Sequence, residues 1–162
     1  MPLTRRTEIA LEAEATLFIS LHHDSSQKQY FSTWQFEGRT LPYSDTFHGY
    51  SIFVSARSKW AAKSRELATY LGQALHSEGL TPSLHHAEPI PGESRKVLDG
   101  NLGTFEFGEL AVLKSATMPA LLLEAGIIVN RYEEQSIQAG LYHPKVVAAL
   151  VTAIDRYCNR RW

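Results

Sequence analysis

Hydrophobic residues at helical spacing predict three helices in this chain. Residues 4–14 are good helix formers without glycine or proline, which predicts a short helix. Residues 58–77 predict a longer helix that stops before Gly79, and residues 144–159 predict a third. The apolar face of the second helix comprises Trp60, Leu67, Leu71, Ala74 and Leu75. The expected apolar face of the third comprises Val147, Leu150, Val151, Ile154 and Cys158.

Short, continuous apolar runs predict strands at 16–21, 49–55, 110–113 and 120–124. Strands that are buried on both faces have continuous apolar sequences, because neither face contacts water and needs polar side chains. Alternation of such runs with helices predicts an α/β layered domain with a largely parallel sheet. No internal repeat or break in composition divides the sequence, so we expect one domain over 1–162.

Two long stretches show no clear period. Residues 25–48 are polar and aromatic and are expected to form a long surface excursion, and residues 80–108 form a region rich in proline and glycine. Further along, Asn130 is a candidate helix cap, and Glu133 three positions on predicts a capping-box arrangement.

Composition narrows the class of protein. The chain has 162 residues, 44% of them hydrophobic and 20% charged, which is typical of a folded domain. Its net charge of -1 gives no broad electrostatic reason to expect nucleic acid as a partner. The single cysteine, Cys158, excludes an intrachain disulfide framework and is expected to be a packing residue. No run reaches the roughly 20 apolar residues that span a membrane, and the first residues lack the pattern of a secretory signal.

Two predicted strands end in side chains that can perform chemistry. His22 follows the apolar run at 18–21, and Glu124 follows the run at 120–123. Ligand sites in α/β sheets form beyond the carboxyl ends of strands, so the two side chains could meet at one site. The alternative for Glu124 is a buried ion pair. The motifs GxSxG, HExxH, GxxxxGK[ST] and GxGxxG are all missing from the sequence, which disfavours the enzyme classes that carry them.

Several segments together resemble a known family. The segment FISLHHD at 18–24 resembles the FISIHAD strand and turn of the zinc-dependent N-acetylmuramoyl-L-alanine amidases. The segment LAVLKSATMPALLLEAGIIVN at 110–130 is similar to that family's vLrnt.mPavLvElGFlsN segment, and residues 6–10 are similar to the helix before the histidine strand. The order and separation of these segments also match, so the resemblance covers nearly the whole chain.

The resemblance implies a mixed α/β sheet flanked by helices and a cell-wall hydrolase that acts in the periplasm or outside the cell. Its members cut the peptidoglycan amide between muramic acid and L-alanine. The matching positions imply that His22 is a ligand of Zn²⁺ and that Glu124 is the general base. The family's DxGHGG turn and the glutamate after it, which supply the other two zinc ligands, have no counterpart in this sequence. We therefore expect the chain to correspond to the C-terminal two thirds of the family domain.

The segment at 84–95 is a candidate source of replacement ligands. His86 and Glu88 could join His22 around a metal, since these are donors that suit zinc. The favoured alternative is a substrate-cleft loop whose polar groups pair with one another. Arg95 is a candidate partner for a peptide carboxylate, because its planar fork binds carboxylates through two hydrogen bonds. A surface salt bridge to Glu88 or to Glu93 is the alternative for this arginine.

His23 and Asp24 are further candidate substrate contacts, with an exposed or packed imidazole as the alternative for His23. Three hypotheses for function remain at this point. The first is a zinc-dependent amidase that acts on peptidoglycan. The second is an inactive remnant of the amidase fold or a cell-wall-binding module, and the third is a zinc hydrolase acting on a different amide.

Overall fold

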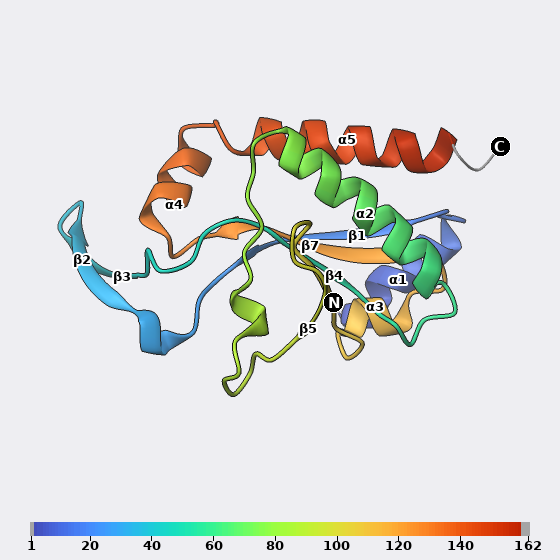
Figure 1. Cartoon of the computed structure of the whole chain (residues 1–162), viewed down its shortest axis with the longest axis horizontal. Coiled ribbons are helices and arrows are strands. Elements are labelled where there is room, and N and C mark those ends of the chain that lie inside the picture. The colour runs from blue at the N-terminus through green and yellow to red at the C-terminus, as the bar shows by residue number, and fades with distance from the viewer. Residues whose placement is uncertain (1, 160–162) are drawn as a thin grey trace.

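A sheet of five strands runs through the middle of the part of the chain that the computed structural model describes, residues 2–159. The remaining residues of the predicted 1–162 domain lie outside this described part. Helices cover both faces of the sheet (Figure 1). The strands lie in the order β1-β7-β4-β6-β5. They span β1 (Phe18–Asp24), β4 (Ser51–Val54), β5 (Lys96–Asp99), β6 (Thr104–Glu106) and β7 (Ala120–Ile127).

The sheet is mixed, as the family resemblance implies. β1 pairs with β7 and β4 pairs with β6 in parallel, whereas β7 pairs with β4 and β5 pairs with β6 in antiparallel fashion. Half of the pairings are therefore parallel, fewer than the apolar runs alone predicted. β5 and β6 can pair in antiparallel fashion because a short turn joins them, whereas parallel neighbours need a longer crossover.

Helices α2 (Ala61–Ser77) and α5 (His143–Asn159) cover one face of the sheet, which we call the α2–α5 face. Both helices were predicted. Leu121 and Leu123 of β7 are fully buried beneath them, together with Leu67 and Leu71 of α2. The main core of the domain lies in this layer.

Helices α1 (Leu3–Glu12) and α3 (Ala111–Ser115) cover the opposite face, which we call the α1–α3 face. Phe53, Phe105 and Leu122 project into this second core. The 3-10 turn η2 (His85–Ala87) lies on the same side of the sheet, because His86 packs edge-on against Phe53. The α1–α3 face is thus covered by short elements and a loop.

The interpretation of residues 110–113 as a strand is wrong, because these residues begin α3. Val112 and Leu113 are buried in the second core, and a run of four apolar residues cannot by itself distinguish a strand from one buried helical turn. β5 and β6 were not predicted within 80–108. They are only four and three residues long, and a register irregularity interrupts their pairing.

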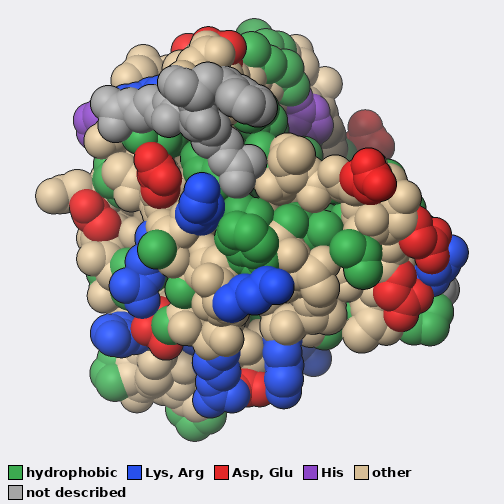
Figure 2. All heavy atoms as spheres, turned by 90° about the vertical axis from the view of Figure 1, so that its right-hand side faces the viewer, with side chains coloured by type: hydrophobic (Ala, Val, Ile, Leu, Met, Phe, Trp, Pro, Cys, Tyr) green, Lys and Arg blue, Asp and Glu red, His purple; other side chains and the backbone are tan. Residues whose placement is uncertain are grey.

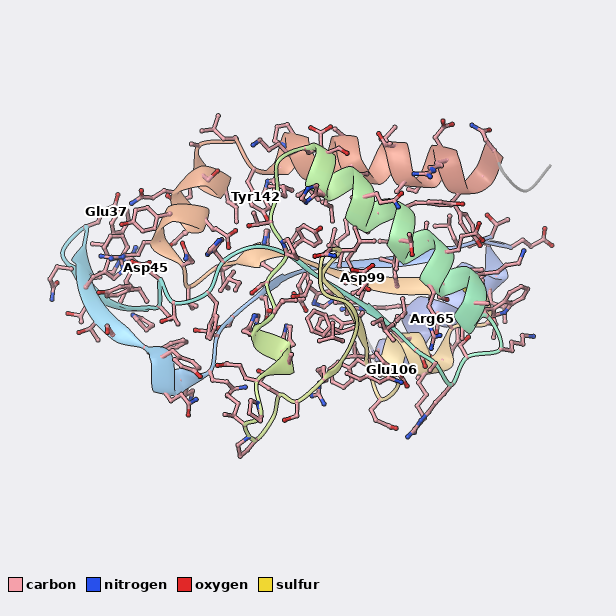
Figure 3. The ribbon with its side chains drawn as sticks, in the orientation of Figure 1. Glu37, Asp45, Arg65, Asp99, Glu106 and Tyr142 are labelled. Atoms are coloured by element: carbon pink, nitrogen blue, oxygen red, sulfur yellow. The ribbon has the colours of Figure 1, made fainter. Side chains whose placement is uncertain are left out.

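The excursion at 25–48 contains a hairpin of β2 (Ser32–Phe36) and β3 (Arg39–Tyr43), after the 3-10 turn η1 (Lys28–Tyr30). Glu37 and Gly38 form its turn with φ angles of 49° and 74°, as in the two-residue turns that match strand twist. Asp45, labelled in Figure 3, follows the hairpin. It pairs with Arg131 at the start of α4 (Arg131–Gln138). This ion pair fixes the base of the hairpin to the domain.

The helix ends and faces agree only in part with the predictions. Asn130 caps α4 and accepts hydrogen bonds from the backbone of Tyr132 and Glu133, as predicted. Glu133 does not complete the capping box, because its carboxylate accepts hydrogen bonds from the backbone N–H groups of Gly49 and Ile127. On α5 the buried positions are Val146, Ala149, Ala153 and Tyr157.

The predicted apolar face of α5 is therefore rotated by about one position. Val147 and Val151 are 57% and 62% exposed, whereas Leu150 and Cys158 pack against the main core. The assignment of Cys158 as a packing residue is thus confirmed. Among the described residues no single helix is long and apolar enough to cross a membrane, and α4 with α5 meets that test only as a pair bent by 81°.

The end of the molecule farthest from the hairpin carries charges of both signs. Figure 2 views this end, and its Lys and Arg side chains gather in the lower half. The carboxyl ends of β1 and β7, where the candidate chemistry lies, point away from it in Figure 1.

Gly72 of α2 provides a test of the packing. A methyl group added there would lie 2.8 Å from Leu102 Cβ and 2.9 Å from the Leu102 backbone oxygen. Helix propensity alone favours Gly72→Ala by about 1 kcal/mol, but overpacking costs about 1–3 kcal/mol. We expect Gly72→Ala to lower the free energy of unfolding, measured by urea denaturation. Ser77→Ala on the exposed side of α2 is the control and should change it by less than about 0.5 kcal/mol. A more stable Gly72→Ala protein would contradict this packing.

Candidate functional site

The backbone places His22 and Glu124 side by side. The two residues are register partners in the parallel pairing of β1 with β7. Side chains alternate between the faces of a sheet, so His22 follows Phe18 and Ser20, and Glu124 follows Leu122, on the α1–α3 face. His22 is exposed at the edge of the sheet, and its Nε2 lies 3.0 Å from Ser20 Oγ.

Glu124 lies between β1 and β4 near the end of β7. Its carboxylate is half-buried, and Oε2 has no hydrogen-bond partner among the described residues. Burial, and then the negative charge of Asp24, raise the pKa of Glu124 to about 7, while His86 acts in the opposite direction. The environment therefore favours a carboxyl group that takes up and releases a proton near neutral pH.

β1 does not stop at Leu21 as predicted but continues through Asp24, with a register irregularity after His22. Asp24 Oδ2 lies 2.8 Å from His86 Nε2 and 3.1 Å from His85 Nε2. Both histidines belong to η2. The end of β1 thus meets a loop that lies about sixty residues later in the chain.

Further polar side chains contact the Nδ1 atoms of the two imidazoles. His85 Nδ1 is 2.9 Å from Ser83 Oγ, and His86 Nδ1 is 2.8 Å from Glu93 Oε2. The other oxygen of Glu93 accepts a hydrogen bond of 2.7 Å from Gln27 Nε2. Each ring is therefore fixed at Nδ1 and directs Nε2 towards Asp24.

The charges in this group stabilise one another. Burial opposes ionisation of Asp24, but contact with the imidazoles of His85 and His86 outweighs it and holds the pKa of Asp24 well below its usual range. Burial also lowers the pKa of His86, but the carboxylates of Asp24 and Glu93 more than offset this effect and raise it. The group is consequently polar and ordered although its side chains are mostly buried.

Asp24, His85 and His86 are the described residues whose donor atoms come close enough to hold a metal ion, all within 4.8 Å of one another. The candidate set of His22, His86 and Glu88 does not form among the described residues, whereas His86 pairs with Glu93 within its own loop, as the favoured alternative expected. His86 belongs to the observed group, but His22 and Glu88 do not. The reason is the three-residue extension of β1 beyond Leu21, because it presents Asp24 to the histidine loop and leaves His22 at the edge of the sheet.

The other candidate residues have different partners. Glu88 accepts a hydrogen bond of 2.8 Å from Tyr30 Oη. Arg95 donates from Nη2 to the Gly92 backbone oxygen, and its guanidinium lies 3.7 Å from the centre of the Phe107 ring. The predicted salt bridge of Arg95 to Glu88 or Glu93 is not among the ion pairs of the described residues. His23 lies towards α5, with its Nε2 3.3 Å from His143 Nε2.

Hollows of useful size lie elsewhere on the surface. A hollow of about 360 Å³ between β1 and α5 is lined by His22, His23 and His143 together with apolar side chains. A larger one of about 490 Å³ lies around the start of α4 and is lined by His48, Glu133 and Tyr142 among others. Glu124 lines neither of these two hollows. The expectation that the side chains of His22 and Glu124 meet at one site therefore stays a prediction.

Sequence comparison identifies the family. The family model described as N-acetylmuramoyl-L-alanine amidase matches residues 1–156. The chain belongs to this family. The resemblance inferred from the two strand segments is thereby confirmed.

Individual relatives of the amidase family are distant from this chain. Two proteins of Buchnera aphidicola, whose names place them among these amidases, are 21% and 26% identical and come from the Schizaphis graminum and Baizongia pistaciae subspecies. The matches cover 98% and 97% of this chain and 73% and 70% of those proteins. The crystal structure of the amidase Ami1 from Mycobacterium smegmatis shares the fold with a TM-score of 0.72 and 17% identity. That match covers 98% of this chain but 61% of the Ami1 chain.

The raised pKa of Glu124 predicts a pH-dependent difference in stability. Folding raises this pKa from 4.5 to about 7, so the stability that the protonated form contributes is present below about 4.5 and is lost as the pH rises through about 7. We expect metal-free wild type to lose on the order of 1 kcal/mol relative to Glu124→Gln between pH 5 and pH 8. Urea denaturation in the presence of a chelator measures this difference.

Glu109→Gln is the matched control, because Glu109 is exposed near α3. Its pH profile of stability should follow that of the wild type. A Glu124→Gln protein whose profile runs parallel to that of the wild type would show that burial of this carboxyl group is not significant.

Proposed function

We propose that this chain hydrolyses the peptidoglycan amide that joins N-acetylmuramic acid to L-alanine, and that it acts in the periplasm or outside the cell. The match of residues 1–156 to the amidase family supports the reaction class. The observation that carries the proposal within the chain is the Glu124 carboxylate, held at the end of a buried strand with one oxygen left unpartnered. We assign residues 1–162 to a single catalytic domain.

Glu124 is the proposed general base. A carboxylate near neutral pKa can take a proton from the attacking water and pass it to the departing amine. The carboxylate must stay in place while the proton moves, and β7 provides this rigidity, because it is paired on both sides and seven of its eight residues are buried.

Zinc is the cofactor that the resemblance implies. A bound zinc ion polarises an amide carbonyl and lowers the pKa of its water, and a catalytic zinc site normally has three protein ligands. Around His22 the described residues do not supply the two further donors, so this position alone does not fit. Asp24, His85 and His86, on the same face of the sheet, do have the donor chemistry that fits zinc.

A second candidate function is an amidase fold that binds the cell wall without cutting it. The observation that favours it is that the described residues around His22 supply no further donors for a metal ion. The two candidates differ in one measurable product, because only the hydrolase releases stem peptides with a free amino group on L-alanine.

Arg95 is the proposed contact for a carboxylate of the stem peptide. Its Nη2 is bonded to Gly92, but its buried Nε has no hydrogen-bond partner among the described residues. The guanidinium carbon lies 3.7 Å from the centre of the Phe107 ring, and this contact orients the group before a ligand arrives. Asp24, His86, Glu88 and His23 remain weaker candidate substrate contacts, because each already has a side-chain partner.

The substitution Glu124→Gln tests the function. Gln keeps the shape of the side chain but cannot carry the proton, so we expect the release of L-alanine-ended peptides to fall by about 10²–10⁴-fold. Mass spectrometry of digested muropeptides measures this product. Glu109→Gln should retain wild-type activity. If Glu124→Gln is as active as the wild type, Glu124 is not the base, and if the wild type releases no such peptide, the binding module becomes the better description.

The role of Arg95 predicts a selective effect of Arg95→Lys. Lysine keeps the charge but loses the planar fork, so KM for muropeptides with a free terminal carboxylate should rise roughly tenfold. Muropeptides with an amidated terminus should show little change, and this comparison is the internal control. An equal effect on both substrates would show that Arg95 stabilises the loop and does not bind the substrate carboxylate.

A further inference from the structure

Three donor atoms from two distant segments converge at one point on the α1–α3 face. Asp24 Oδ2 comes from the end of β1, and the Nε2 atoms of His85 and His86 come from the turn η2. The distances from the carboxylate oxygen to the two nitrogens are 3.1 and 2.8 Å. A tetrahedral zinc ion with bonds of about 2.0–2.1 Å requires ligand atoms roughly 3.3 Å apart. The two distances from Asp24 are slightly shorter than this spacing, and the two imidazole nitrogens lie within 4.8 Å of each other.

His85 is the most deeply buried of the three residues. It is 2% exposed, and its Nε2 lies 3.1 Å from Asp24 Oδ2 but without the geometry of a hydrogen bond to any described residue. A buried polar atom without a partner costs about 1–3 kcal/mol, and an ion at the site is one of the few explanations for it. His85 Nε2 is directed into the point where the three donors converge.

The outer contacts fix the orientation of the two imidazole rings. Glu93 Oε2 can accept a hydrogen bond from His86 Nδ1–H, which leaves Nε2 as the nitrogen for coordination, and Ser83 Oγ lies within hydrogen-bond distance of His85 Nδ1. Histidines that bind metals commonly bond their second nitrogen to a carboxylate or another oxygen, which orients the ring. Glu93 is itself held by Gln27 and is only 7% exposed. This support is more extensive than a chance cluster of polar residues would have.

We propose that Asp24, His85 and His86 bind one divalent transition-metal ion, with zinc as the best match to two imidazoles and a carboxylate. The site differs from the one that the resemblance implies, because His22 is not among its ligands. Its third ligand comes from two residues further along β1. The inference deepens the proposed function, since Glu124 lies on the same face of the sheet, but binding of the metal can be measured without catalysis.

Equilibrium dialysis of the chelator-treated wild type against Zn²⁺, followed by elemental analysis, tests the site. We expect about one zinc ion per chain. Asp24→Asn and His86→Gln should weaken binding by more than about 100-fold, because each removes a ligand, whereas Glu93→Gln should weaken it by about 10–100-fold, as loss of a supporting carboxylate does. His22→Gln is the matched control and should bind as the wild type does. Circular dichroism confirms that each variant is folded.

A second measurement needs no variant. Anomalous scattering at the zinc edge, from crystals of the wild type grown with Zn²⁺, should give a peak among Asp24, His85 and His86. A peak at His22 instead, loss of binding in His22→Gln alone, or a wild type that binds no zinc would each overturn the proposal. Stoichiometric zinc at this position without release of peptides would leave the metal site standing and reject the proposed function, whereas release of peptides without zinc there would do the reverse.

Discussion

The parallel pairing of β1 with β7 is the interaction on which the candidate site depends. Five consecutive register pairs, from Phe18 with Ala120 to His22 with Glu124, hold the two strands together. These two segments are also the ones that carry the family resemblance. The pairing converts two separate stretches of sequence into one sheet end, and the irregularity after His22 then allows Asp24 to reach η2. Without this register the carboxylates of residues 24 and 124 would have no reason to lie on the same face.

The sequence was sufficient for the large elements and for this strand pair. Long apolar periods predicted α2 and α5, and the continuous runs predicted β1, β4 and β7. The sequence pattern was insufficient to predict the short elements. The run at 110–113 became α3 because tertiary packing decides the state of a single turn, and β5 and β6 have too few residues to show a period. The face of α5 was misjudged because Ala149 and Ala153 fill its buried side while larger valines stay exposed.

The individual residues of the candidate site could be predicted from the sequence, but which of them meet in the folded chain could not. The placement of His22 beside Glu124 followed from two strand ends, and the paired histidines at 85 and 86 were visible as a concentration of imidazoles. Their meeting with Asp24 depends on where a strand stops and on how a loop without a period folds back. Neither is encoded in local spacing. The burial of His85, which is the most deeply buried member of the group, is a property of the folded chain alone.

Two of the three converging donors are neighbours in sequence, on a 3-10 turn of only three residues. Such a turn has little hydrogen bonding of its own, so it keeps its shape through its contacts with Ser83, Glu93 and the aromatic side chains around it. If this segment opens, both imidazoles leave together and Asp24 is left alone. Both imidazoles therefore depend on the same turn, and a metal ion bound there would tie this turn to the end of β1.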